Sequence, residues 1–69
     1  MTNATELATQ AGDSDPRTGL RAVAALRRLL ERLEAVQVRS ARVHGWSWQE
    51  IADELGVSRQ AVHKKHGRR

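Results

Sequence analysis

Basic and hydrogen-bonding side chains cluster near the C-terminus of this 69-residue chain. Four of them are spaced to share one face of a helix that carries no carboxylate: Arg59, Gln60, His63 and Lys64. Their side chains all donate hydrogen bonds, and the arginine and the lysine also carry a positive charge. Such a face is suited to binding an anionic partner.

Positive charge is concentrated toward the same end of the chain. Residues 1–16 hold three acids and no lysine or arginine, whereas residues 17–69 hold all twelve lysines and arginines against five acids, a net charge of +7. From Val57 onward there are five basic residues and no acid. This uneven distribution favours a polyanionic partner, of which nucleic acid is the simplest. The alternative is a solvated basic tail that only confers solubility.

The stretch that must position this face reads as two short helices joined by a tight turn. Ser47 and Glu50 have the spacing of a capping box at the start of the first helix. An apolar stripe follows at i, i+3, i+4 and i+7, formed by Trp48, Ile51, Ala52 and Leu55. Gly56 comes next, where a left-handed conformation would end the helix without a steric penalty.

The second helix is predicted to begin after Ser58, which is a good N-cap residue. Ala61, Val62 and Lys65 lie on the side that can return to the first helix. The basic face described above lies on the opposite side. The pattern therefore predicts a packed helix pair that presents its charged surface outward.

The run Ile51-Ala52-x-x-Leu55-Gly56-Val57-Ser58-x-x-x-Val62 resembles the bacterial helix-turn-helix signature, and it is especially similar to sigma factor region 4 and to the resolvase-type helix-turn-helix. In that family the Ala52 position is small so that the helices approach, the Gly56 position makes the turn and the Val62 position packs inward. The resemblance covers about a third of the chain and implies a DNA-binding domain. Two amphipathic helices with a glycine turn and no DNA-binding role are the alternative.

The resemblance implies that the helix after Ser58 reads double-stranded DNA in the major groove. Base contacts are expected from Arg59, Gln60 and His63, with guanine suiting the arginine and adenine suiting the glutamine. Phosphate contacts are expected from Ser47, Gln49, Ser58, Lys64, Arg68 and Arg69. Trp46 and Trp48 are predicted to pack in the core, and base stacking is the alternative role for them.

Asp15-Pro16 is a typical helix start, and no proline or glycine interrupts the chain between Gly19 and Gly45. The sequence therefore predicts a long helix over residues 16–44. Residues 1–15 have no sustained apolar period and are predicted to be a disordered acidic tail, with a short helical turn around residues 6–10 as the alternative. Residues 45–69 form the helix-turn-helix with its basic C-terminus. The fold class predicted is all-α: a three-helix helix-turn-helix domain with an extended first helix and a disordered N-terminal tail.

A helix of this length would extend about 42 Å, more than two short helices can cover. Its C-terminal part is predicted to form the core with the two short helices, through Leu33, Val36, Val43, Ile51, Leu55, Val57 and Val62. Four apolar residues are then left uncovered and are predicted to form a homodimer interface: Leu20, Val23, Leu26 and Leu30. A kink near residues 36–38 that folds the first half back is the alternative. A dimer would favour half-sites about 10 bp apart or a multiple of that.

Other functions have little support in the sequence. The chain has no cysteine, no phosphate-binding loop and no nucleophile beside a base, so we expect no enzyme, metal, cofactor or small-molecule site. No apolar run reaches the roughly 20 residues of a membrane span, and no signal peptide is recognisable, so we expect a cytoplasmic, nucleoid-associated protein. The competing function is a protein-docking adaptor that binds RNA polymerase or another regulator through the long helix.

Overall fold

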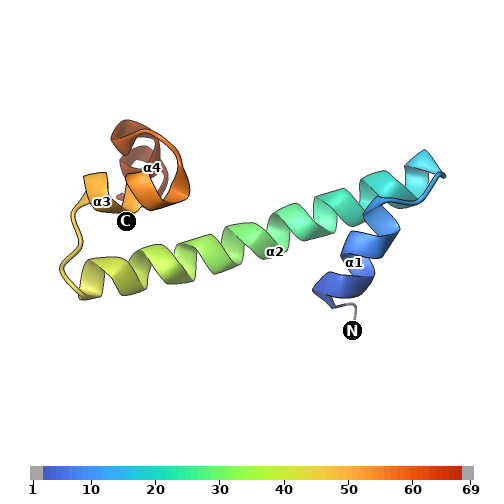
Figure 1. The fold of residues 1–69 in the computed structure, drawn as a ribbon, viewed down its shortest axis with the longest axis horizontal. Helices are drawn as coiled ribbons and strands as arrows, with labels where there is room; N and C mark the ends of the chain where they lie inside the picture. The colour runs from blue at the N-terminus through green and yellow to red at the C-terminus, as the bar shows by residue number, and fades with distance from the viewer. Residues whose placement is uncertain (1–2, 68–69) are drawn as a thin grey trace. The chain divides into compact units, whose positions relative to one another are not determined.

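The computed structural model describes residues 3–67, and these residues form four helices and no strand. The helices are α1 (Ala4–Ala11), α2 (Pro16–Val43), α3 (Trp48–Leu55) and α4 (Arg59–His66) (Figure 1). The chain divides into two compact units, one up to Leu33 and one from Glu34 onward, and α2 contributes to both. The all-α prediction, with an extended helix before a helix-turn-helix, is confirmed.

Helix α2 is uninterrupted over 28 residues. The Asp15 carboxylate accepts hydrogen bonds from the backbone N–H of Arg17 at 3.3 Å and from the hydroxyl of Thr18 at 3.1 Å. At the other end Gly45 follows the helix with φ +87°, a left-handed conformation that suits glycine. Residues 36–38 are helical, so the alternative in which the helix breaks there is wrong.

Helix α1 lies where the sequence predicted a disordered tail, so that prediction is wrong for residues 4–11. The Asn3 side chain caps this helix by accepting a hydrogen bond from the backbone N–H of Glu6 at 2.8 Å. Gly19 of α2 is buried, and a Cβ there would lie 3.5 Å from the carbonyl oxygen of Ala11. The helix thus has a local side-chain cap, although its segment contains a single large apolar residue, Leu7.

The core of the second unit is small and joins three helices. Its buried residues are Val38 of α2, Ile51 and Ala52 of α3, and Val62 of α4, with Ala41 and Trp48 packed against them. The four buried residues are each at most 5% exposed, and Ala52 is fully buried. Ala41 and Trp48 are half-buried. This cluster fixes α4 against α3.

The predicted core was wrong in its choice of α2 residues. Leu33, Val36 and Val43 are 51%, 62% and 78% exposed, and two other members of the predicted set, Leu55 and Val57, are also exposed. The face that packs on α3 and α4 instead runs through Glu34, Val38 and Ala41, at i, i+4 and i+7. The apolar stripe of α2 is wider than the face that α3 and α4 cover. Contacts with these two helices therefore decide which of its residues are buried.

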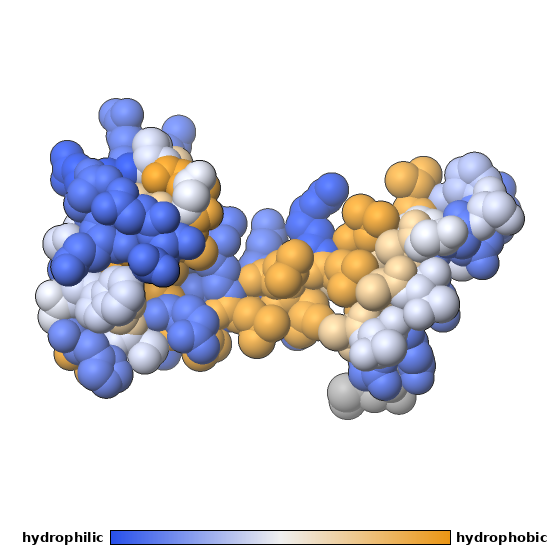
Figure 2. Space-filling view, in the orientation of Figure 1, coloured by the Kyte–Doolittle hydropathy of each residue, from blue (hydrophilic) through white to orange (hydrophobic). Residues whose placement is uncertain are grey.

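Hydrophobic side chains consequently remain at the surface of α2 (Figure 2). Of the four residues predicted to pair two copies, Leu20, Val23 and Leu30 are 68%, 38% and 63% exposed, and Leu26 is half-buried. None of the helices described is both long and apolar enough to cross a membrane.

Candidate nucleic-acid interface

Helix α3 is closed at both ends by local hydrogen bonds, as the sequence predicted. The Ser47 hydroxyl accepts from the backbone N–H of Glu50 at 3.1 Å, and the Glu50 carboxylate accepts from the backbone N–H of Ser47 at 2.8 Å. The hydrogen bond from this backbone N–H holds the pKa of Glu50 below its usual value. Gly56 ends the helix with φ +73°. These bonds fix where the turn between α3 and α4 lies.

The start of α4 is fixed in the same way. The Ser58 hydroxyl accepts a hydrogen bond from the backbone N–H of Ala61 at 3.0 Å. One turn later Val62 enters the core beside Ala52. The structural roles that the helix-turn-helix signature assigns to the small residue, the turn glycine and the inward valine are therefore confirmed.

The residues predicted to contact bases all project from the exposed side of α4. Arg59, Gln60 and His63 are exposed, as is Lys64 beside them, and none of the four makes an ion pair within residues 3–67. Among the other predicted phosphate contacts, the exposed residues Ser47, Gln49 and Ser58 lie at the N-termini of α3 and α4. Arg68 and Arg69 lie outside the described residues. The structure thus brings the base-reading candidates together on one helix.

His63 has a packing contact that the sequence did not suggest. Its ring meets the ring of Trp48 edge to face, with centroids 5.2 Å apart. A Cβ on Gly67 would lie only 2.7 Å from the Cδ2 atom of His63, so the glycine leaves room for the imidazole. The imidazole is held in a defined position at the side of α4 although the residue remains exposed.

Arg42 is a second residue that sequence reasoning missed. Its guanidinium lies 4.5 Å from the centroid of the Trp48 ring and donates a hydrogen bond to the carbonyl oxygen of Trp46 at 2.7 Å. A cation over an indole face is favourable, and so is a cation in the last turn of a helix. Arg42 therefore ties the end of α2 to the loop before α3 and to the core tryptophan. An arginine four residues before one tryptophan and six before another was the available signal.

Glu34 connects α2 to the last turn of α4. Its Oε2 atom lies 2.6 Å from the Nε2 atom of His66 and 3.2 Å from the Nζ atom of Lys65. The hydrogen bond from His66 is the main reason why the pKa of Glu34 lies below its usual value, and Lys65 acts in the same direction against the effect of burial. This contact holds the C-terminal end of α4 to α2.

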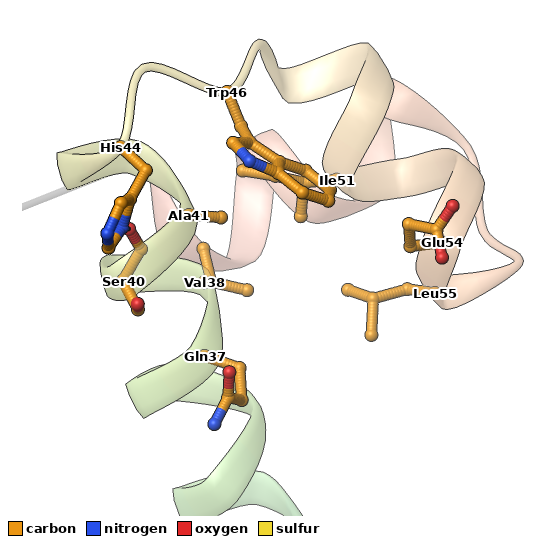
Figure 3. Close-up of a pocket in the computed structure, with 9 residues that line it drawn as sticks. All are labelled: Gln37, Val38, Ser40, Ala41, His44, Trp46, Ile51, Glu54 and Leu55. Atoms are coloured by element: carbon orange, nitrogen blue, oxygen red, sulfur yellow. The ribbon is translucent and has the colours of Figure 1, made fainter.

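A groove of about 360 Å³ lies on the unit that carries the helix-turn-helix (Figure 3). Val38, Ala41, Ile51 and Leu55 form much of its apolar wall, and Trp46 lies beside Ile51 at the loop. Trp46 and Ile51 occupy the two sequence positions of a hydrophobic staple around the start of α3. No group of three or more metal-ligating side chains occurs within the part of the chain that the structure describes.

Comparison with known proteins places this arrangement among DNA-binding folds. Residues 26–66, more than half of the chain, match a family model described as a homeodomain-like domain. No curated protein and no solved structure matches the chain. The matched range begins in the middle of α2 and ends with the last residue of α4.

Proposed function

Since the chain belongs to the homeodomain-like helix-turn-helix family, we propose that it is a small bacterial transcriptional regulator that reads double-stranded DNA with α4. The observation that carries this proposal is the exposed face of α4, which is basic, has no carboxylate and begins one residue after the N-cap Ser58. In helix-turn-helix proteins the N-terminal residues of the second helix approach base edges in the major groove. A protein with this role acts at the nucleoid.

Base recognition is assigned to three side chains of α4. Arg59 suits a bidentate contact with guanine O6 and N7, and Gln60 suits adenine N6 and N7. His63 lies one turn further on, where its ring is oriented by Trp48. The first two are the stronger candidates because their fork-shaped groups match the donor and acceptor pattern of a single base.

Phosphate contacts would set the position of α4 in the groove. The N-terminus of α3 supplies backbone N–H groups together with Ser47 and Gln49, and Ser58 and Lys64 flank the base-reading residues. Gln49 also donates a hydrogen bond to Asp53 at 2.8 Å, which holds its amide at the surface of α3. Arg68 and Arg69 remain phosphate candidates from the sequence.

A homodimer through α2 would deliver two reading helices to one site. The support is the apolar surface that the chain itself leaves uncovered, at Leu20, Val23, Leu26 and Leu30. A two-fold dimer would bind half-sites about 10 bp apart or a multiple of that. Light scattering after size-exclusion chromatography tests this, and a monomer at micromolar concentration would contradict it.

The test of the function is binding to random duplexes across a range of salt, followed by selection and sequencing of the bound DNA. We expect affinity to fall steeply with salt, because phosphate contacts release counterions, and we expect one site to be enriched. Absence of binding at low salt would contradict the proposal.

The exposed apolar residues of α2, among them Leu30, Leu33 and Val36, favour one second candidate. In this candidate the long helix docks on RNA polymerase or another regulator and the protein acts as an adaptor. Apolar docking depends weakly on salt, so a partner complex that survives high salt in the absence of DNA would support the adaptor. Both roles are compatible in one chain.

A further inference from the structure

Helix α2 carries a line of arginines that the reading of DNA by α4 does not use. At 100° per residue, four of those within the first unit fall within an arc of about 60°, and they form the arginine face: Arg17, Arg21, Arg28 and Arg32. They succeed one another at intervals of four and seven residues and span about 22 Å along the helix. All four are exposed.

The charges on this face are not balanced within the described chain. The ion pairs among residues 3–67 are both made by Glu34, with Lys65 and His66, so none of the four arginines is paired with a carboxylate there. The arginine face is therefore free to bind an external anion.

The spacing of these arginines is unfavourable for the helix alone. Arg17 and Arg21, and likewise Arg28 and Arg32, are like charges at i and i+4, an arrangement that destabilises a helix. Ala24 and Ala25 lie near the same side and add no bulk that would cover the guanidinium groups. A surface polyanion would remove the repulsion and would meet a row of fork-shaped donors that match phosphate oxygens.

We propose that the arginine face binds the phosphate backbone of duplex DNA without regard to sequence, as a second surface in addition to the base-reading face of α4. The length of about 22 Å corresponds to about six or seven base pairs along the duplex axis, at 3.4 Å each. Phosphate contacts carry no sequence information, so this surface adds affinity and not specificity.

An anionic membrane is the other polyanion that a basic amphipathic helix fits. DNA is favoured because the same chain carries a DNA-binding fold, and because α2 has no aromatic residue that would sit at a lipid interface. The inference rests on the proposed function only in taking DNA as the polyanion.

The experiment compares two triple variants on a random 30-bp duplex across salt. R21Q/R28Q/R32Q removes three charges, whereas R21K/R28K/R32K keeps them at the same positions. Each phosphate contact contributes about 0.9 to the slope of log affinity against log salt, so we expect the slope of the glutamine variant to fall by about 2–3 and that of the lysine variant to remain. An unchanged slope for the glutamine variant would overturn the proposal. A loss of binding by this variant that occurs with anionic phosphatidylserine vesicles and not with DNA would also overturn it.

A single-residue comparison applies if the triple variant loses helicity by circular dichroism. Arg27 and Arg28 are neighbours in sequence but about 100° apart on the helix, and Arg27 lies outside the arginine face. R28Q is expected to lower the slope by about 0.9, whereas R27Q should leave it unchanged. Equal slopes for the two variants would overturn the proposal.

Two further arms identify which DNA is bound. If the effect of R21Q/R28Q/R32Q disappears on a 12-bp duplex, the arginine face contacts DNA that flanks the α4 site. If the variant abolishes the association of two differently labelled duplexes, the face contacts a second duplex. Failure of the proposed function would be seen in a separate experiment. In that case R59A would leave the preference for a selected site unchanged. The slope of log affinity against log salt would still be lowered by R21Q/R28Q/R32Q.

Discussion

The Nε2 atom of His66 lies 2.6 Å from the Oε2 atom of Glu34 and so links the last turn of α4 to the middle of α2. The two residues are 32 positions apart in sequence. A carboxylate with a donor at this distance is a charge-assisted acceptor, which is stronger than a neutral one. Helix α4 is thereby held at its C-terminal end, at the opposite end from the turn that fixes its beginning.

The first prediction concerns the pH dependence of stability at this contact. A carboxyl whose pKa is lower in the folded than in the unfolded chain stabilises the fold above its ordinary pKa, here 4.5, and this stabilisation is lost as the pH falls through the lowered folded value. Glu34→Gln should therefore cost about 1 kcal/mol of unfolding free energy at pH 6, and this cost should shrink as the pH is lowered below 4.5. Denaturant melts at a series of falling pH values measure the change. Glu31→Gln, at an exposed site of the same helix, is the control, and a cost for Glu34→Gln that does not change with pH would refute the account.

The second prediction concerns the close approach of α3 and α4. Ala52 is fully buried between them, so Ala52→Leu would force the helices apart and should cost about 1–3 kcal/mol. Ala61→Leu, at an exposed position of α4, should cost far less. Thermal melts followed by circular dichroism compare the two, and equal losses would show that Ala52 does not limit the approach.

The third prediction concerns the turn. Gly56 has φ +73°, and a Cβ there meets no atom within 4 Å, so the cost of a side chain arises from the backbone conformation alone. Gly56→Val should cost about 1–2 kcal/mol or more, whereas Gly56→Asn should cost less because asparagine tolerates the left-handed region. Stability measured by denaturant unfolding decides this. If the two variants were equally stable, backbone conformation would not be the reason for the glycine.

The fourth prediction concerns Arg42. Its removal takes away the guanidinium over the Trp48 ring and the hydrogen bond to the Trp46 carbonyl, so Arg42→Ala should cost about 1–2 kcal/mol. It should also change the tryptophan fluorescence, since both tryptophans of the chain lose a contact. Arg39→Ala, three residues earlier on α2, is the control for loss of charge. Unchanged fluorescence in the Arg42 variant would argue against the contact.

Local features of this protein could be predicted from the sequence, whereas long-range ones could not. The caps at Ser47 and Ser58, the turn at Gly56 and the inward Val62 depend on neighbours within a few residues, and all four are present. Helix α1 was predicted only as an alternative, a short helical turn around residues 6–10, because its segment has one large apolar residue, Leu7, and no sustained apolar period.

The face of α2 that packs on α3 and α4 was predicted wrongly for a different reason. Its apolar stripe is wide enough to offer several faces, and the choice of the one through Val38 depends on Glu34 meeting Lys65 and His66 more than 30 residues away. The contact of Arg42 with Trp48 likewise depends on how the loop between α2 and α3 turns. Periodicity identifies a candidate face and does not reveal which partner that face will meet.

The central claim, that α4 reads bases, is tested most directly by comparing Arg59→Ala with Lys64→Ala on a selected site and on random duplexes of equal length. Arg59→Ala should cost about 1–3 kcal/mol more on the selected site than on random DNA and should relax one base position. Lys64→Ala should weaken both duplexes alike, because a phosphate contact is the same on any sequence. If Arg59→Ala also weakened both duplexes alike, α4 would not be reading bases through this residue.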